Sequence, residues 1–153
     1  MKLRIRDNSI RLRLTRSEVK RLEKANDPEA RVQSKICFGP EIGQSLTYCI
    51  EVDAGVSKIQ AEYNPGIDPT NSQTTSQPNS MGTTILIKIP ETLALEWAST
   101  DRIALQGEQS VSENEVLHIL IEKDFFCLKP RQHECEDESD MYPNPGVSTG
   151  NCA

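Results

Sequence analysis

Long hydrophobic runs are missing from this sequence. No window approaches the roughly 20 apolar residues that a membrane-spanning helix needs, and the N-terminal stretch lacks the apolar segment of a secretory signal. Glycine-rich phosphate-binding loops are also absent. With only two histidines, no Ser-His-Asp or Cys-His catalytic grouping can be argued. We therefore expect no membrane partner, and no known catalytic motif is visible.

Cysteines are few and odd in number. Three of the five, Cys37, Cys49 and Cys127, lie in or beside apolar strand-like runs. This pattern favours buried thiols in a reducing compartment over a disulfide framework. The sequence thus predicts a cytoplasmic protein.

The hydrophobic content is low because two stretches are strongly polar. Hydrophobic residues make up 36% of the 153-residue chain, and mean hydropathy is −0.52. Residues 64–82 and 130–153 are rich in proline and small polar residues, and the other 110 residues contain many Leu, Ile and Val. We expect one domain over 1–129, with a mobile insert at 64–82 and an acidic tail at 130–153. The domain is long enough to fold alone.

An internal repeat is the main architectural signal. Residues 1–53 can be aligned with residues 57–124 in three segments of the same order. The first segment has an offset of 56 residues, the second 75 and the third 71. The 19-residue jump between the first two offsets equals the length of the 64–82 insert. Duplication is therefore a better explanation than chance similarity between β-rich stretches.

Each copy is predicted to be a ββαββ unit. Residues 2–6 and 10–14 alternate between apolar and basic side chains, which is typical of two strands, and the turn residues between them indicate a hairpin. A short helix begins after Thr15 or Ser17, with Val19 and Leu22 on its inward side. In the second copy the helix follows Pro90, with the apolar stripe Leu93, Ala94 and Trp97. Further strands are expected near 31–37, 46–52, 57–63, 85–89, 102–106 and 115–123. The predicted fold class is α+β, a pseudo-two-fold antiparallel sandwich or barrel with two helices, each helix lying over its own unit's strands.

Charge is distributed unevenly along the chain. Residues 1–35 carry a net charge of +6, whereas residues 36–153 carry −12. A basic stripe on the first hairpin is the candidate anion-binding site, and it consists of Lys2, Arg4, Arg6, Arg11 and Arg13. The stripe is either the solvent face of an amphipathic hairpin or a site for a phosphate-containing ligand. The acidic balance of the whole chain argues against nucleic acid as the partner.

The tail carries five carboxylates within residues 134–140. Such a run repels itself unless a cation or a basic surface is near. Glu136, Asp137 and Asp140 could hold a divalent cation, whereas docking on the basic hairpin or simple solvation is the alternative. Cys127, His133 and Cys135 suggest a zinc site only weakly, because their spacing is not a usual zinc pattern. The ring of Tyr142 is expected to pack on the domain.

The two ends of the chain, MKLRIRDNSIRLRLTRSEV and EKDFFCL…ECEDESDMYPNP, resemble a family of short uncharacterised bacterial proteins. That family is a domain of unknown function found in Bacteroidota-type genomes. The resemblance also covers strand 115–123 and the helix segment ETLALEWASTD, and it implies no activity. By the resemblance, Cys127, Glu136, Asp137, Asp140 and the Pro143-Asn144-Pro145 turn match the family's tail motif. The 64–82 insert is atypical for the family.

Two looser resemblances give alternative functions. The stretch ILIKIPETLALEWASTDRIAL resembles the strand–helix–strand unit of AbrB-type swapped-hairpin regulators, which bind DNA. The basic hairpin followed by acidic strands is similar to triphosphate-tunnel enzymes, whose barrels bind triphosphates with metal.

Three functions follow from these patterns. The first hypothesis is a non-enzymatic cytosolic module that binds a protein partner or a phosphate-containing ligand through its basic hairpin face and acidic tail. The second is a metal-dependent phosphoanhydride or phosphoester hydrolase, in which the arginines hold phosphate and Glu136, Asp137 and Asp140 hold Mg²⁺ or Mn²⁺. The third is a swapped-hairpin DNA-binding regulator. An enclosed cavity of arginines and carboxylates would favour the second, and an exposed flat ribbon the third.

Overall fold

The computed structural model describes residues 1–24, 30–39, 44–66, 82–126 and 139–145. Ten elements follow one another in the order ββαββ–ββαββ. They are β1 (Lys2–Arg6), β2 (Ser9–Leu14), α1 (Arg16–Leu22), β3 (Val32–Cys37), β4 (Ser45–Asp53), β5 (Gln60–Asn64), β6 (Thr83–Pro90), α2 (Glu91–Ser99), β7 (Ala104–Ser110) and β8 (Val116–Lys123). The predicted element order is confirmed, and the largest boundary error is at β7, which begins later and extends further than expected.

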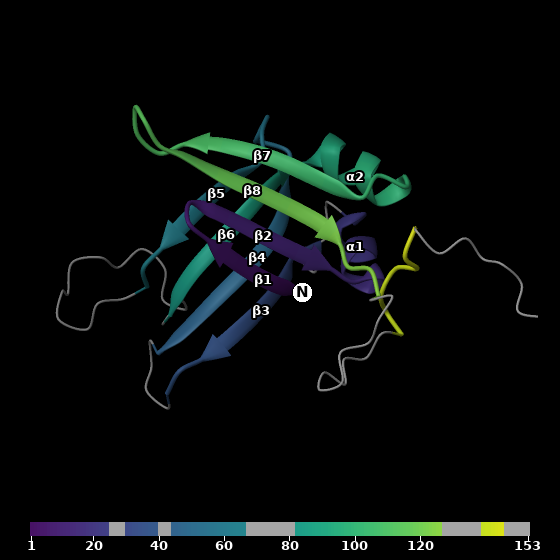
Figure 1. Cartoon of the computed structure of the whole chain (residues 1–153), viewed down its shortest axis with the longest axis horizontal. Coiled ribbons are helices and arrows are strands. Elements are labelled where there is room, and N and C mark those ends of the chain that lie inside the picture. The colour runs from purple at the N-terminus through teal and green to yellow at the C-terminus, as the bar shows by residue number, and fades with distance from the viewer. Residues whose placement is uncertain (25–29, 40–43, 67–81, 127–138, 146–153) are drawn as a thin grey trace, which may run out of the picture.

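The strands form two four-stranded sheets, which pack face to face (Figure 1). Sheet A has the order β1-β2-β8-β7 and sheet B the order β3-β4-β6-β5. The outer pairs of each sheet are antiparallel, but the central pairs β2/β8 and β4/β6 are parallel. The expectation of a wholly antiparallel structure is therefore wrong. Among the described strands there is no closed barrel, so the sandwich alternative holds.

The hairpins of each ββαββ unit are divided between the two sheets. The β1–β2 hairpin pairs with β7–β8 of the second unit, and β3–β4 pairs with β5–β6. Our prediction that each helix lies over its own unit's sheet is wrong for this reason. Each helix instead carries the chain from one sheet to the other, because α1 follows a strand of sheet A and α2 a strand of sheet B. Both helices lie at the same end of the sandwich (Figure 1).

The core lies between the sheets and is closed by the helices at one end. Inward residues alternate with polar outward residues along β2, where Ile10, Leu12 and Leu14 are buried. The helices contribute Val19, Leu22, Ala94 and Trp97, all buried as predicted. Trp97 is the largest fully buried side chain among the described residues. None of the helices described is long and apolar enough to cross a membrane.

Strand register gives corresponding positions in the two sheets. Leu12 lies opposite Ile121 in sheet A, and Ile87 lies opposite Ile50 in sheet B. These pairs match the sequence offsets of 75 and 71 residues. In the outer strands Leu3 lies opposite Leu12 and Ala61 opposite Ile87. β1 thus corresponds to β5 with Leu3 at the place of Ala61, two residues beyond the position that the sequence alignment indicated.

The cysteine prediction is partly wrong. Cys49 is fully buried on β4, but Cys37, at the end of β3, is exposed. Burial raises the pKa of the Cys49 thiol, although an Arg31 guanidinium lies 2.8 Å from its sulfur. Cys127 and most of the 64–82 insert lie outside the described residues.

Candidate anion-binding surface

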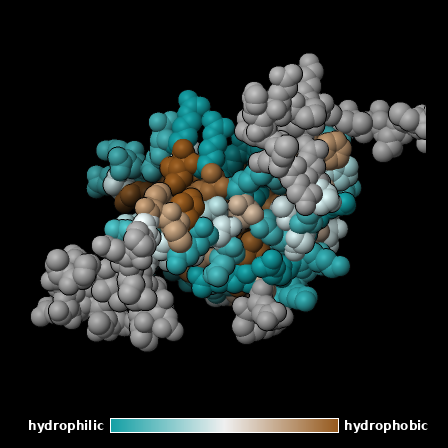
Figure 2. Space-filling model, turned by 90° about the horizontal axis from the view of Figure 1, so that it is seen from below, coloured by the Kyte–Doolittle hydropathy of each residue, from teal (hydrophilic) through white to brown (hydrophobic). Residues whose placement is uncertain are grey.

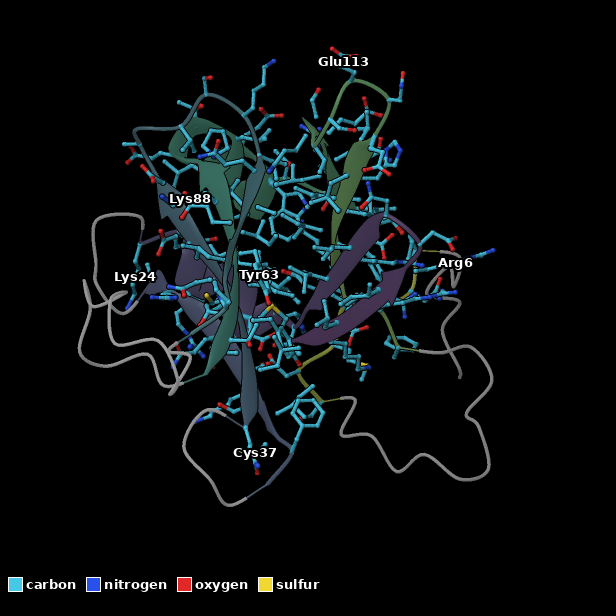
Figure 3. The ribbon with its side chains drawn as sticks, turned by 90° about the vertical axis from the view of Figure 1, so that its left-hand side faces the viewer. Arg6, Lys24, Cys37, Tyr63, Lys88 and Glu113 are labelled. Atoms are coloured by element: carbon cyan, nitrogen blue, oxygen red, sulfur yellow. The ribbon has the colours of Figure 1, made fainter. Side chains whose placement is uncertain are left out.

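The five basic residues predicted from the sequence lie on one face of one hairpin. Across β1 and β2, Lys2 lies opposite Arg13 and Arg4 opposite Arg11. The alternate residues, such as Leu12, point toward the core. The basic side chains therefore lie on the outer face of sheet A, and Figure 3 shows Arg6 extending away from sheet B. We call this face, with Lys2, Arg4, Arg6, Arg11 and Arg13, the basic face.

A cavity of about 420 Å³ lies on the basic face near the hairpin turn. Three guanidiniums line it, those of Arg4, Arg6 and Arg11, and the neighbouring strands contribute His118 and Glu108. These side chains come together because β8 pairs with β2 and β7 with β8, so Arg6 and His118 lie in one cross-strand row. His118 is an exposed surface histidine, as its sequence pattern indicated. The arrangement is an open, basic hollow, not an enclosed tunnel.

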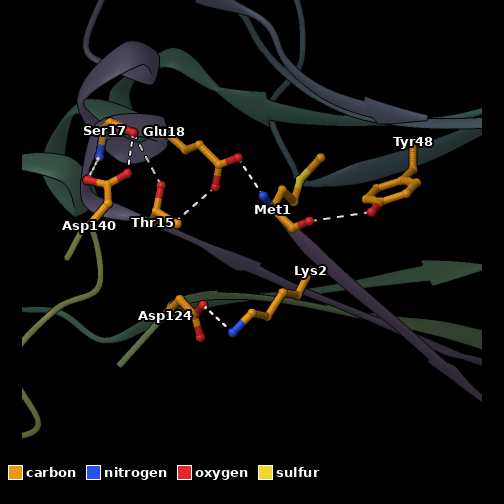
Figure 4. A network of polar contacts seen from close by, with 8 residues as sticks. All are labelled: Met1, Lys2, Thr15, Ser17, Glu18, Tyr48, Asp124 and Asp140. Carbon is orange, nitrogen blue, oxygen red and sulfur yellow. Dashed lines mark hydrogen bonds and ion pairs between the residues drawn. The ribbon is translucent and has the colours of Figure 1, made fainter. Parts of the chain in front are cut away.

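Carboxylates neutralise part of the basic face. Glu122, on β8, accepts two bonds from Arg11, at 2.5 and 2.6 Å, and lies 3.4 Å from Nε of Arg13. The Lys2 ammonium lies 2.9 Å from the buried carboxylate of Asp124 (Figure 4). In the part of the chain that the structure describes, Arg4 has no carboxylate partner, and Arg6 contacts only its neighbour Asp7, at 3.4 Å. The uncompensated positive charge is therefore concentrated at Arg4 and Arg6.

A second cavity, of about 450 Å³, adjoins the first through Arg11. Its lining includes Arg13 and Glu122, and the aromatic pair Phe125 and Phe126. Asn144 and Pro145 of the tail complete this wall. Two of the predicted tail-motif residues therefore lie beside the basic face, whereas Pro143 does not line either cavity.

The described tail segment, residues 139–145, docks at the start of α1 and beside the end of β8. Tyr142 donates its N–H to the Asp124 carbonyl at 2.8 Å, and its carbonyl accepts the Phe126 N–H at 3.2 Å. The Tyr142 ring lies 5.8 Å from that of Phe125 and packs against the core. The prediction that this ring packs on the domain is confirmed. The acidic residues 134–138 lie outside the described residues, so their docking on the basic face stays a prediction.

Asp140 acts at the start of α1. Its carboxylate accepts the Ser17 N–H at 3.0 Å and also the Ser17 hydroxyl, while its carbonyl accepts the Arg16 N–H at 2.9 Å (Figure 4). The hydrogen bond from the Ser17 hydroxyl lowers the pKa of Asp140. Both carboxylate oxygens are thus engaged in holding the helix.

The other predicted cation and zinc ligands, Glu136, Asp137, Cys127, His133 and Cys135, lie outside the described residues. Within the described ranges, no group of three His, Cys, Asp or Glu side chains is placed to hold a metal ion. The cation site involving Asp140 stays a prediction.

Sequence reasoning missed two buried charged residues at the end of β8. Lys123 points into the core, where its ammonium donates to the Thr100 carbonyl at the end of α2 and lies 5.8 Å from the centre of the Trp97 ring. Burial lowers the pKa of Lys123. The alternation along β8, with Ile119 and Ile121 inside, would have placed Lys123 inside as well. Only tertiary structure shows that the C-terminus of α2 is within its reach.

Comparison with known proteins gives one match. The model of a family of unknown function, DUF7009, matches residues 1–146. The chain belongs to this family. No curated protein and no solved structure matches it, so neither comparison indicates a function. Since the family model extends to residue 146, it includes both the basic face and the tail segment that docks beside it.

Proposed function

We propose that this DUF7009 protein is a non-enzymatic binding module whose basic face binds the phosphate group of a ligand. The supporting observation is a difference between the two outer faces of the sandwich. At the positions of Lys2, Arg4, Arg6, Arg11 and Arg13, sheet B has Gln60, Glu62, Asn64, Leu86 and Lys88. Only Arg13 has a basic counterpart. The fold alone therefore does not require the other four positive charges.

The one basic counterpart is neutralised. Lys88 lies 2.8 Å from Glu62 and 3.4 Å from Asp53, and the hydrogen bond with Glu62 raises the pKa of Lys88. Figure 3 shows Lys88 on the side of the molecule opposite Arg6. On sheet A, by contrast, three guanidiniums converge on one cavity, and two of them have no carboxylate from another strand. Guanidiniums form paired, charge-assisted hydrogen bonds with phosphate oxygens, so the cavity at Arg4 and Arg6 is suited to a phosphate group.

The repeat supports the same proposal from another side. We propose that the two ββαββ units arose by duplication, since their strand orders and central registers correspond position by position. In a duplicated protein, the basic outer face of sheet A and the near-neutral one of sheet B are a specialisation of one copy. We also propose a cytoplasmic location, supported by the unpaired buried thiol of Cys49.

The hydrolase alternative loses its structural premise. A triphosphate tunnel requires a closed barrel around the ligand, and the strands described here form two separate sheets with the arginines outside. The swapped-hairpin alternative rests on the segment that becomes β6, α2 and β7, in the order that the resemblance implied. That segment contributes no arginine to the basic face, so it gives DNA binding no support from charge.

Titration with inorganic pyrophosphate by calorimetry tests the proposal. Each charge-assisted hydrogen bond is worth about 1.5–3 kcal/mol, so Arg4→Gln and Arg6→Gln are each expected to weaken binding by about tenfold or more. Lys88→Gln is the matched control on sheet B and should leave the affinity unchanged. Binding that weakens equally in Lys88→Gln, or no binding at millimolar pyrophosphate, would contradict the proposal. A single-stranded oligonucleotide that binds more tightly than pyrophosphate would point to nucleic acid instead.

A further inference from the structure

The two open edges of the sandwich are built differently. At the β5/β7 edge, the Gln109 side chain accepts the Ala61 N–H at 2.7 Å and donates to the Ala61 carbonyl at 3.1 Å. Gly107 lies so close to Ile59 that a Cβ atom on the glycine would come within 2.7 Å of the Ile59 Cβ. An amide clamp and a close backbone approach therefore join sheet A to sheet B at this edge.

The β1/β3 edge has no such clamp. Val32 lies opposite Ile50 and Leu105 opposite Ile121, so Ile36 on β3 occupies the position that Gln109 has on β7. An isoleucine cannot form the two hydrogen bonds of the amide. The hydrogen bonds and ion pairs found among the described residues include none between β1 and β3. The sheets are thus not fastened to each other along this edge.

Large apolar side chains are exposed where the clamp is missing. Ile5 on β1 is 56% exposed, Ile36 on β3 is 42% exposed and Phe38 just after β3 is 73% exposed. Figure 2 shows a hydrophobic patch on the face seen from below, the side on which β1 and β3 lie in Figure 1. We call Ile5, Ile36 and Phe38 the apolar edge. Contiguous exposed apolar residues beside an unpaired strand are typical of a protein-binding surface.

We propose that the apolar edge binds an extended strand of a partner protein, in which apolar residues alternate with Asp or Glu. β1 is the outermost strand of sheet A, so the backbone groups on its free side can pair with an added strand. Alternate residues of an added strand point to opposite faces of the sheet. One set would contact Ile5 and Ile36, and the other would lie beside Arg4 and Arg6.

Charge complementarity selects an acidic partner. The outward side chains of β1 are basic throughout, namely Lys2, Arg4 and Arg6. On the neighbouring edge, β3 contributes Lys35. A second copy of the chain that paired through β1 would bring two rows of positive charge together, which is unfavourable. An alternating strand with carboxylates meets both the charge and the apolar surface, so the partner is a different protein.

Binding of a synthetic nine-residue peptide of alternating Val and Glu tests this inference. Its affinity is to be measured by fluorescence anisotropy, with backbone protection of β1 followed by amide hydrogen exchange. A Val/Lys peptide of the same pattern, and a Val/Glu peptide N-methylated at alternate residues, are each expected to bind at least tenfold more weakly. The N-methyl groups remove the donors that strand pairing requires. Increased protection of β1 amides, and not of β5 amides, is the expected exchange result.

Variants separate the apolar edge from general stickiness. Ile36→Asp places a carboxylate in the apolar edge at an exposed position, so the fold should be retained and peptide affinity should fall at least tenfold. Val111→Asp is the matched control, because Val111 is 57% exposed beside the β7–β8 turn. Equal binding to both variants, or no binding of the Val/Glu peptide to the wild type, would overturn the inference. So would concentration-dependent dimerisation that Ile36→Asp abolishes, since a second copy would then occupy the edge.

Discussion

Glu122 is the residue whose replacement distinguishes a binding surface from a merely solvated one. Its carboxylate is held by Arg11 at 2.5–2.6 Å and its side chain is 16% exposed. The substitution Glu122→Gln keeps the shape and one acceptor but removes the negative charge. Stability and anion affinity should therefore change in opposite directions.

The two effects can be estimated from the geometry. Charge-assisted hydrogen bonds contribute about 1.5–3 kcal/mol, and glutamine retains part of this, so we expect a loss of about 1–2 kcal/mol in the free energy of unfolding. An anion at Arg4 and Arg6 would lie roughly two strand spacings, about 9 Å, from Glu122. At an effective dielectric constant of about 40, the repulsion that is removed is about 1 kcal/mol per unit charge. Pyrophosphate should consequently bind about fivefold more tightly.

Urea denaturation and pyrophosphate calorimetry on the same samples measure both quantities. Glu51→Gln is the matched control, since Glu51 lies opposite Lys88 on sheet B as Glu122 lies opposite Arg13 on sheet A. That variant should leave the affinity unchanged. If Glu122→Gln lowers stability with no gain in affinity, Arg11 and Arg13 serve only to hold the sheet, and the basic face is not the binding site.

Two further predictions concern the tail and the closed edge. Asp140→Asn should lower stability by about 0.5–2 kcal/mol at pH 7, as loss of a helix cap does. Since the Ser17 hydrogen bond lowers the pKa of Asp140, its stabilisation is present above the pKa of an unfolded aspartate, about 3.9, and disappears as the pH falls through the lower folded value; urea melts of both proteins that differ equally at pH 7 and pH 2 would refute this. Gly107→Ala should cost about 1–3 kcal/mol because the new methyl group meets Ile59, and an unchanged melting temperature would show that the edge is not tightly packed there.

Local pattern was enough to predict the elements and the basic face. The alternation in residues 2–6 and 10–14 predicted β1 and β2, and it placed Arg4 and Arg11 on the same side of the hairpin, as the register confirms. Period-two alternation determines which face a residue occupies as soon as the chain is extended. The same reasoning failed at Cys37, because an apolar run at the end of an edge strand does not guarantee burial.

Pairing between the units could not be read from the sequence. A strand such as β2 presents the same side chains whether its partner is parallel or antiparallel, so nothing in residues 9–14 indicates that β8 runs beside it in the same direction. Which sheet a hairpin joins depends on the path of the connecting helix, and each helix here crosses to the other sheet. The cavity at Arg6 and His118 exists only because of that exchange.

The sequence by itself determined the repeat, the two helices, the side of each strand that faces water and the concentration of positive charge on the first hairpin, because these depend on spacing along the chain. Tertiary structure alone decided which charges are neutralised and which edge is closed. Glu122 neutralises Arg11 across β8, and Gln109 clamps one edge where Ile36 leaves the other open. These contacts join residues far apart in the chain, and their free energies depend on distances that only the folded structure establishes.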